Sequence, residues 1–430
     1  MKEIGIGLLG FGTVGAGVVE GLQQNGKLLE ERLDLRLALR RLADLDLDSD
    51  RGVKADRALM TRDAGEAIRD PNVDIVVELI GGVTKAKEFI RQALELGKPV
   101  VTANKALLAE AGAELHRLAA EKKTALYFEA SVGGGIPIIK AVREGLVANR
   151  ITSVYGILNG TCNYILTRME EEKLPFEQVL KAAQQAGYAE AEPSLDVDGH
   201  DTAHKAVVLA SLAHGFPVPM SAVHVEGIRN ISAGDISYAA EMGYRIKLLA
   251  VIKQGGNGVE ARVHPTLVPH AHPLAAVSGV FNAVLVSGDI VGDTLYYGRG
   301  AGRRATASAV LADLADAARD LSSGARRPPV LRRESGKLRP IGEIVTRCYL
   351  RLSLLDKPGV LALVAQALGR KGISIASVMQ KETRVGQHVP VLVVTHSAPE
   401  SAFRAALAEI DRLEVVGAPT VRIRIEDFQE

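Results

Sequence analysis

The stretch from Gly187 to Lys205 concentrates side chains that could take part in catalysis. Besides Lys205 it holds two histidines and five carboxylates, namely Glu190, Glu192, Asp196, Asp198 and Asp201. Glycine and proline residues interrupt it, so most of it should be loop, and a helix should run from about Thr202 to Ala213. Asp201 and Lys205 are then one helical turn apart on the same face. The pair could be a solvated surface ion pair, or a carboxylate that keeps a proton-donating lysine charged.

The composition is that of a globular protein. A chain of 430 residues is long enough for two or three domains. Its net charge of +1 gives no electrostatic reason to expect a nucleic acid or a membrane as partner, and no apolar run is long enough to span a bilayer. Two distant cysteines, Cys162 and Cys348, form neither a disulfide framework nor a zinc site. A reducing, cytoplasmic location is therefore expected.

A glycine-rich turn near the start predicts dinucleotide binding. An apolar strand, Lys2–Leu9, leads into Gly10-Phe11-Gly12-Thr13-Val14-Gly15, and a helix over Val14–Leu29 and a strand over Leu33–Leu39 follow. The first glycine permits the tight turn, the second lets a pyrophosphate approach the backbone, and the third lets helix and strand pack closely. The phosphates would lie at the helix N-terminus.

Residues at the expected end of the second strand bear on the choice of cofactor. An acid there binds the ribose hydroxyls of NAD, whereas basic groups accept the 2′-phosphate of NADP. Arg40 and Arg41 come first, and Asp44 follows. NADP is the expected cofactor and NAD the alternative. Two exposed arginines without a ligand are the non-functional interpretation.

Strands and helices continue to alternate up to about Glu129, which predicts a doubly wound parallel sheet. Further strands are expected at Val73–Leu79, Pro99–Thr102 and Thr124–Glu129. Ligands bind at the carboxyl ends of such strands. Lys105 opens a helix just beyond one of these ends, where it could meet a nicotinamide or a substrate carbonyl. A lysine exposed at a helix start is the alternative.

Three consecutive glycines lie in the segment from Glu129 to Pro137. They could free backbone carbonyls to turn towards one point, and with one carboxylate they would offer a hard cation an all-oxygen environment. A flexible hinge between domains would have the same composition, so both interpretations stay open.

Past Ile138 the pattern becomes α+β, with strands expected at Ile246–Ile252 and Val259–Val263. A polar turn between a strand and a helix contains Cys162, which has no local base and is read as a packed residue rather than a nucleophile. A second glycine-rich turn, Tyr297–Gly302, precedes a helix over Ala305–Leu321 and could contact an anion or a cofactor.

Residues 323 to 340 are rich in arginine and proline and predict a linker. The β-α-β-β-α-β pattern beyond it predicts a small ferredoxin-like domain that is separate from the catalytic part. The expected elements are Arg347–Leu354, Val360–Arg370, Ser374–Gln380, Val389–His396, Ser401–Ile410 and Val415–Ile425.

The motifs, taken together and in order, resemble those of homoserine dehydrogenases over essentially all of residues 1 to 321. The matching segments are GLLGFGTVG, TANKALLA, EASVGGGIP, ILNGTCNYI, the Gly187–Lys205 stretch, RVHPTLVP and GRGAGRRATASAV. DKPGVLA followed by GISIASVMQ resembles an ACT domain, a module that binds amino acids in regulatory proteins.

The resemblance implies a division into four parts. These are a Rossmann domain (1–130), a catalytic and dimerisation domain (131–321), a linker (322–345) and an ACT regulatory domain (346–430). The last helix of the catalytic part, about 303–321, is expected to return to the Rossmann domain.

The resemblance also implies roles for individual residues. The catalytic residues are Lys205, as proton donor, and Lys105, at the cofactor–substrate junction. Homoserine binding is expected from Glu190 and Asp201, with Asp196 in support. Cofactor contacts are expected from Gly10, Phe11, Gly12, Thr13, Val14, Gly15, Arg40, Arg41, Lys105, Gly187 and Gly302. A monovalent cation, expected to be sodium, would be held by Glu129 and the carbonyls of Val132, Gly134 and Ile136.

The implied reaction is reversible, NAD(P)-dependent hydride transfer between L-homoserine and L-aspartate 4-semialdehyde, in the biosynthesis of threonine, methionine and isoleucine. A homodimer or homotetramer with threonine as effector is expected. Effector binding is expected near the turn Asp356–Gly359 and the strand from Ile373. A purely structural, dimerising ACT module is the alternative. Two other functions stay open, a semialdehyde dehydrogenase with a nucleophilic cysteine and a non-catalytic regulator that senses nucleotides and amino acids.

Overall fold

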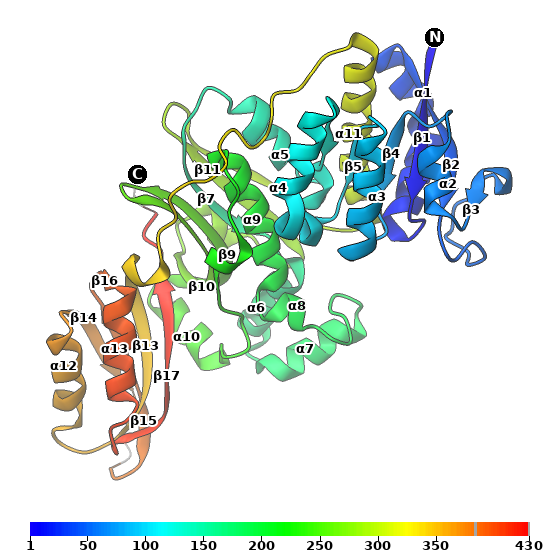
Figure 1. Ribbon diagram of the computed structural model, residues 1–430. Coiled ribbons are helices and arrows are strands. Elements are labelled where there is room, and N and C mark those ends of the chain that lie inside the picture. The colour runs from blue at the N-terminus through cyan, green and yellow to red at the C-terminus, as the bar shows by residue number, and fades with distance from the viewer. Residues whose placement is uncertain (382–384, 429–430) are drawn as a thin grey trace. The chain divides into compact units, whose positions relative to one another are not determined.

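The computed structural model describes residues 1–381 and 385–428 (Figure 1). It divides into two compact units. The first comprises Met1–Gly160, Asp201–Ser221 and Val280–Gly336, and the second comprises Thr161–His200, Ala222–Gly279 and Lys337–Glu430. No helix in the described part of the chain has the length and apolar character needed to cross a membrane.

The first unit contains most of the elements expected for a dinucleotide-binding fold. Its strands are β1 (Lys2–Leu9), β2 (Leu35–Ala43), β3 (Met60–Thr61), β4 (Ile75–Glu78), β5 (Val100–Thr102), β6 (Leu126–Tyr127), β7 (Ile151–Ile157), β11 (Phe281–Gly288) and β12 (Gly292–Arg299). Its helices are α1 (Thr13–Leu33), α2 (Ala64–Arg69), α3 (Thr84–Glu95), α4 (Lys105–Glu121), α5 (Ile138–Lys140), α9 (His200–His214) and α11 (Arg303–Ser323).

Six parallel strands form the central sheet of this unit, in the order β3-β2-β1-β4-β5-β6. This order is that of the Rossmann fold: strands are added on one side from β1 to β3 and on the other side from β4 to β6, so the order reverses between β1 and β4. The predicted doubly wound parallel sheet is confirmed. A ligand is expected at the carboxyl ends of these two strands.

Helix α11 packs on this sheet although it follows β1 by about 300 residues (Figure 1). Its buried face, which includes Val310 and Leu314, belongs to the same core as Ile6 and Leu8 of β1. Glycine in α1 makes the close approach possible, because a Cβ at Gly21 would lie 2.4 Å from a methyl carbon of Leu311. The helix therefore closes the face of the sheet on which α1 lies.

Strand β2 is longer than the sequence predicted. It ends at Ala43 rather than Leu39, because its backbone pairs with β1 up to Leu9. A register shift opposite Ile6 and Gly7 leaves Arg40 without a paired residue on β1. Arg40 and Arg41 therefore lie within the strand, and Asp44 is the first residue after it.

A separate set of three antiparallel strands, β7, β11 and β12, completes the first unit. Their buried residues include Val154 and Val284. Strand β7 ends just before Leu158 and Asn159, which contribute to the site described below.

The second unit contains the remaining elements. Its helices are α6 (Gly160–Glu172), α7 (Phe176–Gln185), α8 (Ser194–Val197), α10 (Ala233–Glu241), α12 (Val360–Arg370) and α13 (Glu400–Ile410). Its strands are β8 (His224–Val225), β9 (Tyr244–Gly255), β10 (Gly258–Pro269), β13 (Val345–Leu355), β14 (Ile375–Gln380), β15 (His388–Thr395), β16 (Ala398–Pro399) and β17 (Val416–Ile425).

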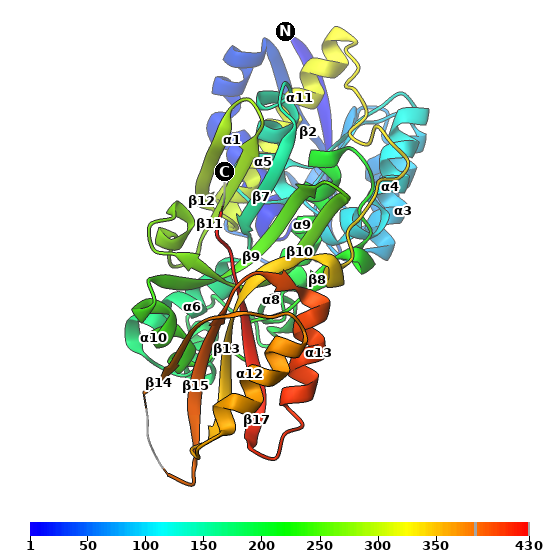
Figure 2. The ribbon, with the colours of Figure 1, turned by 90° about the vertical axis from the view of Figure 1, so that its left-hand side faces the viewer.

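The C-terminal strands form an antiparallel sheet in the order β17-β13-β15-β14, and α12 and α13 cover one of its faces (Figure 2). Helix packing is apolar, since Val364 of α12 and Phe403 of α13 are fully buried against strand residues such as Leu352. The predicted ferredoxin-like arrangement is confirmed.

The sequence pattern predicted a C-terminal domain that is separate from the catalytic part. In the structure, the sheet of this domain pairs with a strand from an earlier part of the chain. The end of β17 pairs in parallel with β10, with Thr266 opposite Arg424 and Leu267 opposite Ile425. The hairpin of β9 and β10, whose two strands have twelve residues each, therefore continues into the C-terminal sheet. We call this junction the β10–β17 seam.

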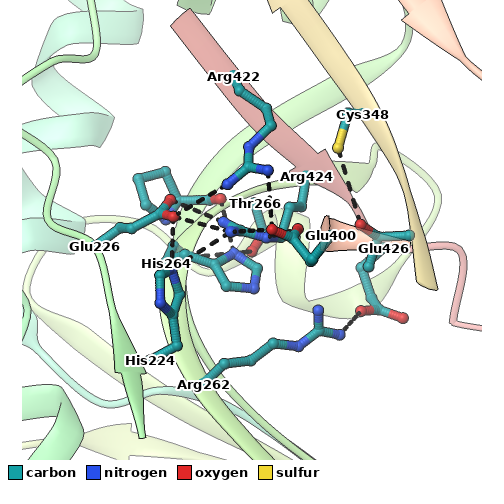
Figure 3. Close-up of polar contacts among 12 residues, drawn as sticks. His224, Glu226, Arg262, His264, Thr266, Cys348, Glu400, Arg422, Arg424 and Glu426 are labelled. Atoms are coloured by element: carbon teal, nitrogen blue, oxygen red, sulfur yellow. Dashed lines mark hydrogen bonds and ion pairs between the residues drawn. The ribbon is translucent and has the colours of Figure 1, made fainter. Parts of the chain in front are cut away.

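Buried charges hold the seam together (Figure 3). Arg424 of β17 is 1% exposed and donates to Glu400 at 2.6 Å and to Glu226 at 2.8 Å. Arg422 lies 2.9 Å from the same Glu400 carboxylate, and His224 lies 2.6 Å from Glu226. Each carboxylate is thus shared by more than one cationic or polar partner, which compensates for its removal from water.

Further buried polar groups at the seam include Arg262 and His264 of β10. Arg262, 1% exposed, pairs with Glu426 at 3.1 Å, and Lys253 also pairs with Glu426. His264 is fully buried, and Thr266 contacts its Nδ1 at 2.9 Å. Burial and the charges of Arg424 and Arg262 lower the pKa of His264 well below its usual value.

Candidate active site

The first turn of α9 positions a buried ion pair. Lys205 donates from Nζ to Asp201 Oδ2 at 2.7 Å and to the carbonyl of Leu158 at 2.6 Å. Asp201 is 4% exposed and Lys205 is 8% exposed. The spacing of four residues brings them together as the sequence predicted, but the pair is buried rather than solvated. The surface-pair interpretation is therefore wrong.

Lys105 reaches the same carboxylate from a different element. It is the first residue of α4, just after β5, and its Nζ lies 3.2 Å from Asp201 Oδ1. Asn104 fixes the start of this helix, because its side chain accepts the Leu107 N–H at 3.1 Å. Two lysines that are a hundred residues apart in sequence thus share one carboxylate.

Asn159 is a site residue that the sequence reasoning did not single out. Its Nδ2 donates to Asp201 Oδ2 at 2.8 Å. The signal that could have found it is its place in a polar turn directly after strand β7. With Leu158 it supplies a fixed acceptor for Lys205 and a fixed donor for Asp201.

The electrostatics of the cluster favour charged groups. Burial alone would raise the pKa of Asp201, but the charges of Lys205 and Lys105 outweigh it and hold that pKa well below its usual range. One carboxylate then faces two ammonium groups, which leaves an excess of positive charge. The Lys105 side chain is 36% exposed and that of Lys205 only 10%, so Lys105 is the more accessible cation. Such a cluster can stabilise negative charge on a carbonyl oxygen and deliver a proton to it.

The glycine-rich turn has the geometry of an anion site. Gly10 has a φ of +98°, and a Cβ at Gly15 would lie 2.0 Å from the Gly10 oxygen, so both positions require glycine. A Cβ at Gly12 would meet nothing within 4 Å, and no side chain caps the start of α1. The N–H groups at this helix start can donate hydrogen bonds to a phosphate. Gly302 likewise precedes α11 without a side-chain cap.

A buried acid orders the neighbouring strand ends. Glu78, the last residue of β4, accepts from Thr102 Oγ1 at 2.7 Å and from the Ile80 N–H at 2.9 Å, and its burial raises its pKa. Asn104 donates to the Gly82 carbonyl at 2.7 Å. Glu78 was missed by the sequence reasoning, although an acid that ends an apolar strand is itself unusual. It fixes the loop beside the predicted cofactor crevice.

The two arginines expected at the cofactor already have partners. Arg40 pairs with Glu3, and Arg41 donates to Asp70 at 2.5 Å. The residue that actually follows the strand, Asp44, accepts the Phe11 N–H at 2.5 Å and so supports the glycine-rich turn. The expectation that the arginines end the strand is wrong, because backbone pairing continues past them.

Glu129 lies in a tightly bonded environment. It is 1% exposed, and its two carboxylate oxygens accept the N–H groups of Ile139 at 2.9 Å and Lys140 at 2.8 Å. Burial raises the pKa of Glu129, and it raises the pKa of the adjacent Asp313 to about 7. Gly133 and Gly134 both have positive φ, so the backbone turns sharply beside the carboxylate. Among the described residues no three His, Cys, Asp or Glu side chains gather as a metal site.

The other predicted residues belong to the second unit. Glu190 is exposed, and its carbonyl accepts from Gln184 Nε2 at 3.0 Å. Asp196 lies in α8, and its carbonyl accepts the Cys162 thiol at 3.2 Å. Gly187 has a φ of +75° just after α7. Cys162 itself is fully buried, as expected of a packed residue and not of a nucleophile.

Known families match nearly the whole chain. The model for the homoserine dehydrogenase NAD binding domain matches residues 10–129, that for homoserine dehydrogenase matches 137–315, and that for the ACT domain matches 349–415. Homoserine dehydrogenase of Pseudomonas aeruginosa is 45% identical over 437 residues, which is 100% of both chains.

Solved structures agree. The crystal structure of a homoserine dehydrogenase from Thiobacillus denitrificans is 44% identical, with a TM-score of 0.93 over 99% of each chain. A hyperthermophilic archaeal homoserine dehydrogenase in complex with NADPH is 27% identical, with a TM-score of 0.64 over 76% of this chain and 99% of that one.

Proposed function

The chain belongs to the homoserine dehydrogenase family, and we propose that Lys105, Asp201 and Lys205 form its catalytic centre. The enzyme is an oxidoreductase that uses a nicotinamide cofactor to interconvert L-homoserine and L-aspartate 4-semialdehyde. The single observation that carries the proposal is the sharing of one buried carboxylate by two lysines.

In the direction of aldehyde reduction, the chemistry that a nicotinamide cofactor held at the Gly10–Gly15 turn would supply is a hydride for the carbonyl carbon. Lys205 donates a proton from Nζ to the carbonyl oxygen as negative charge develops there. Lys105, the more exposed cation, polarises the same oxygen and lowers the cost of that charge. Asp201 and the Leu158 carbonyl hold the Lys205 ammonium in position, and Asn159 in turn fixes Asp201.

Substrate binding is assigned to Glu190, Asp196 and Asp201. The exposed Glu190 carboxylate suits the ammonium group of homoserine, which needs an anionic partner. Asp201 already accepts from Lys205, Asn159 and Lys105, so it would act on the substrate mainly through the lysines.

We propose NADP as the preferred cofactor. The NADPH complex of the archaeal relative supports this choice. The uncapped start of α1 suits the pyrophosphate, with Gly10 to Gly15 and Gly302 beside it. Arg40 and Arg41 would have to leave Glu3 and Asp70 to reach a 2′-phosphate, which argues for only a moderate preference over NAD.

A monovalent cation, sodium by preference, is assigned to Glu129 and the carbonyls of Val132, Gly134 and Ile136. The residues fit such an ion, since one buried carboxylate stands beside a backbone that turns at two glycines. Each Glu129 oxygen uses one lone pair for a backbone N–H and retains another for an ion.

We propose that the ACT domain makes the enzyme sensitive to threonine. An effector can act only if it binds two states of the enzyme with different affinity. The β10–β17 seam supports such coupling, because it joins the ACT sheet directly to the β9–β10 hairpin. A homodimer or homotetramer, with the effector at a shared ACT edge, fits this arrangement.

The test is an initial-rate assay of homoserine oxidation with NADP and NAD side by side, repeated with added threonine and with sodium replaced by a larger cation. Turnover of homoserine that is faster with NADP is expected. The Cys162→Ser variant should retain activity. A semialdehyde dehydrogenase that forms a thiohemiacetal on a nucleophilic cysteine would lose activity in this variant. Purified protein that reduces neither cofactor would instead favour the non-catalytic regulator.

A further inference from the structure

The first unit contains a cavity that is lined by arginines and takes no part in the proposed reaction. Its volume is about 670 Å³, and three segments line it: residues 142–151, the end of α9 at 212–215, and 320–333. The last of these includes most of the chain that leaves α11, drawn in yellow in Figure 1. We call residues 324–336 the strap.

The cavity is distinct from the catalytic centre. Asp201 and Lys205 lie in the first turns of α9, and Leu212 to Gly215 lie at its other end. A helix of 15 residues is roughly 20 Å long. A ligand in the cavity would therefore not touch the reacting atoms.

Two of the five arginines that line the cavity are neutralised locally. Arg143 lies 2.7 Å from Glu144. Arg327 lies 2.6 Å from Glu144, 2.5 Å from Asp320 and 3.1 Å from Asp316. These contacts use the carboxylates of the cavity wall and fix the start of the strap on α11.

The other three guanidinium groups have no such partner. In the described ranges, no carboxylate lies within ion-pair distance of Arg326, Arg332 or Arg333. Arg333 donates to the His214 carbonyl at 2.7 Å and stacks over the Phe216 ring. Three cations gathered at one cavity repel each other unless an anion joins them.

The backbone of the strap is held in place at two of these arginines without help from a ligand. The N–H groups of Arg332 and Arg333 both donate to the Gly215 carbonyl, at 2.8 and 3.0 Å. Together with the Arg333 side chain on the His214 carbonyl, these bonds give donors to two carbonyls at the end of α9, which lessens its negative potential toward an anion. The backbone that carries Arg332 and Arg333 is therefore fixed before a ligand arrives, which lowers the entropic cost of binding.

Apolar side chains supply the rest of the wall. Leu146, Val147, Ile151 and Val330 line the cavity, with Val147 67% exposed. The volume lies within the range of small-molecule sites, which combine an apolar lining with a few charged groups. Arginine recognises phosphate in a planar, bidentate way.

We propose that this cavity binds an organic phosphate that carries at least two phosphate groups and an apolar or aromatic body. The arginines without carboxylate partners bind the phosphates, and the apolar wall takes the body. The proposal is independent of the dehydrogenase assignment, because none of these residues belongs to the catalytic or cofactor sites.

The test uses ATP as the probe, in titration calorimetry of the full-length chain. ATP could also enter the dinucleotide site, so all variants carry Gly12→Glu, whose carboxylate repels phosphate from the start of α1. The position tolerates a side chain, since a Cβ there meets nothing within 4 Å. The test variant adds Arg326→Gln and Arg332→Gln, and the matched control adds Arg32→Gln and Arg117→Gln, two exposed arginines outside the cavity.

ATP is expected to bind Gly12→Glu, and the loss of two charge-assisted contacts should weaken it by about tenfold or more in the test variant. The control variant should bind as Gly12→Glu does. Pyrophosphate, which lacks the body, and citrate, which lacks phosphate, should both bind more weakly. Equal ATP affinity in test and control variants, at unchanged unfolding temperature, would overturn the proposal. Citrate binding as tightly as ATP would overturn the assignment to phosphate.

Discussion

The carboxylate of Asp201 contacts both proposed catalytic lysines, and its role depends on being shared by several groups. Lys205, Lys105 and Asn159 all contact it, so each lysine is held by a contact that the other does not provide. Replacing one member should therefore disable the chemistry without emptying the site.

Lys205→Ala should lower the turnover number for homoserine by roughly 100- to 10,000-fold, because it removes a positioned general acid. Cofactor binding should stay nearly unchanged, since Lys205 lies within α9 and not in the glycine-rich turn that precedes α1. Steady-state kinetics and a cofactor titration measure the two effects. Wild-type turnover in this variant would refute the catalytic assignment.

Asp201→Asn should lower both turnover and stability. The change leaves two ammonium groups close together without their shared anion, which for a buried pair costs about 3 kcal/mol of unfolding free energy. The folded-state pKa of Asp201 is depressed, so its contribution is fully present above about pH 4, the unfolded value, and is lost below it. Urea unfolding at pH 7 should show the full difference; no difference would mean that the carboxylate is not ionised.

Sequence patterns identified this centre only in part. The i, i+4 spacing brought Asp201 and Lys205 together, and Lys105 was indicated by its place just beyond a strand end and by the family motifs. Asn159 and the Leu158 carbonyl escaped notice because nothing in their own identity marks them; their role arises from where β7 ends. The residue types of Arg40 and Arg41, by contrast, suggested a cofactor contact. The sequence could not show that they pair with Glu3 and Asp70, because these partners are distant along the chain.

At the level of elements, the β10–β17 seam is the feature that sequence periodicity could not predict. Only two residue pairs join the strands, but buried charges surround them. Alternating strand patterns give the faces of β10 and β17 but not their neighbours. Arg424 and Arg262 are each 1% exposed, although arginine is almost never fully buried unless it is paired.

Arg424→Met should lower the free energy of unfolding by about 3 kcal/mol or more, because the buried Glu400 and the partly exposed Glu226 lose their main partner. Arg347→Met is the matched control in the same sheet. Its pair with Asp427 is partly exposed, so the loss should be below about 1 kcal/mol. Chemical unfolding of both variants tests the contrast, and equal losses would contradict it.

His264 should make the seam sensitive to acid. It is buried beside Arg262 and Arg424, with Glu226 as the opposing charge, and its pKa in the folded state lies well below the unfolded value near 6.5. Stability is therefore unaffected above that value and falls below it, by about 1.4 kcal/mol per pH unit.

The measurement is the slope of unfolding free energy between pH 7 and pH 5 for the wild type and for His264→Gln. The glutamine variant should be less stable at pH 7 but should show the shallower slope. Parallel slopes would mean that His264 is protonated in the folded protein or does not titrate in this range.

For the whole molecule, the order of strand and helix motifs predicted both architectures correctly. The Rossmann order and the ferredoxin-like sheet follow from local patterns and from rules of chain connection. What those patterns could not show is that the second unit combines segments 161–200, 222–279 and 337–430. Compactness of this kind depends on contacts between distant segments, which no local pattern encodes.

Deleting residues 337–430 should therefore destabilise what is left, because β10 loses β17 and Glu260 loses Arg339. A lower unfolding midpoint and reduced soluble yield are expected, in addition to any loss of threonine response. A truncated enzyme with the midpoint of the full chain would show instead that the ACT domain is a removable module.

The pairing of β10 with β17 also sets an order of events during protein synthesis. The ribosome makes β17 about 150 residues after β10, an interval of roughly 10 to 30 seconds at ordinary rates of translation. During that time the β10 edge and the buried arginine and glutamate side chains around it have no partner strand. The second unit can complete its sheet only after β17 has been released, so a nascent chain stalled in the ACT region would present an open strand edge to chaperones and proteases.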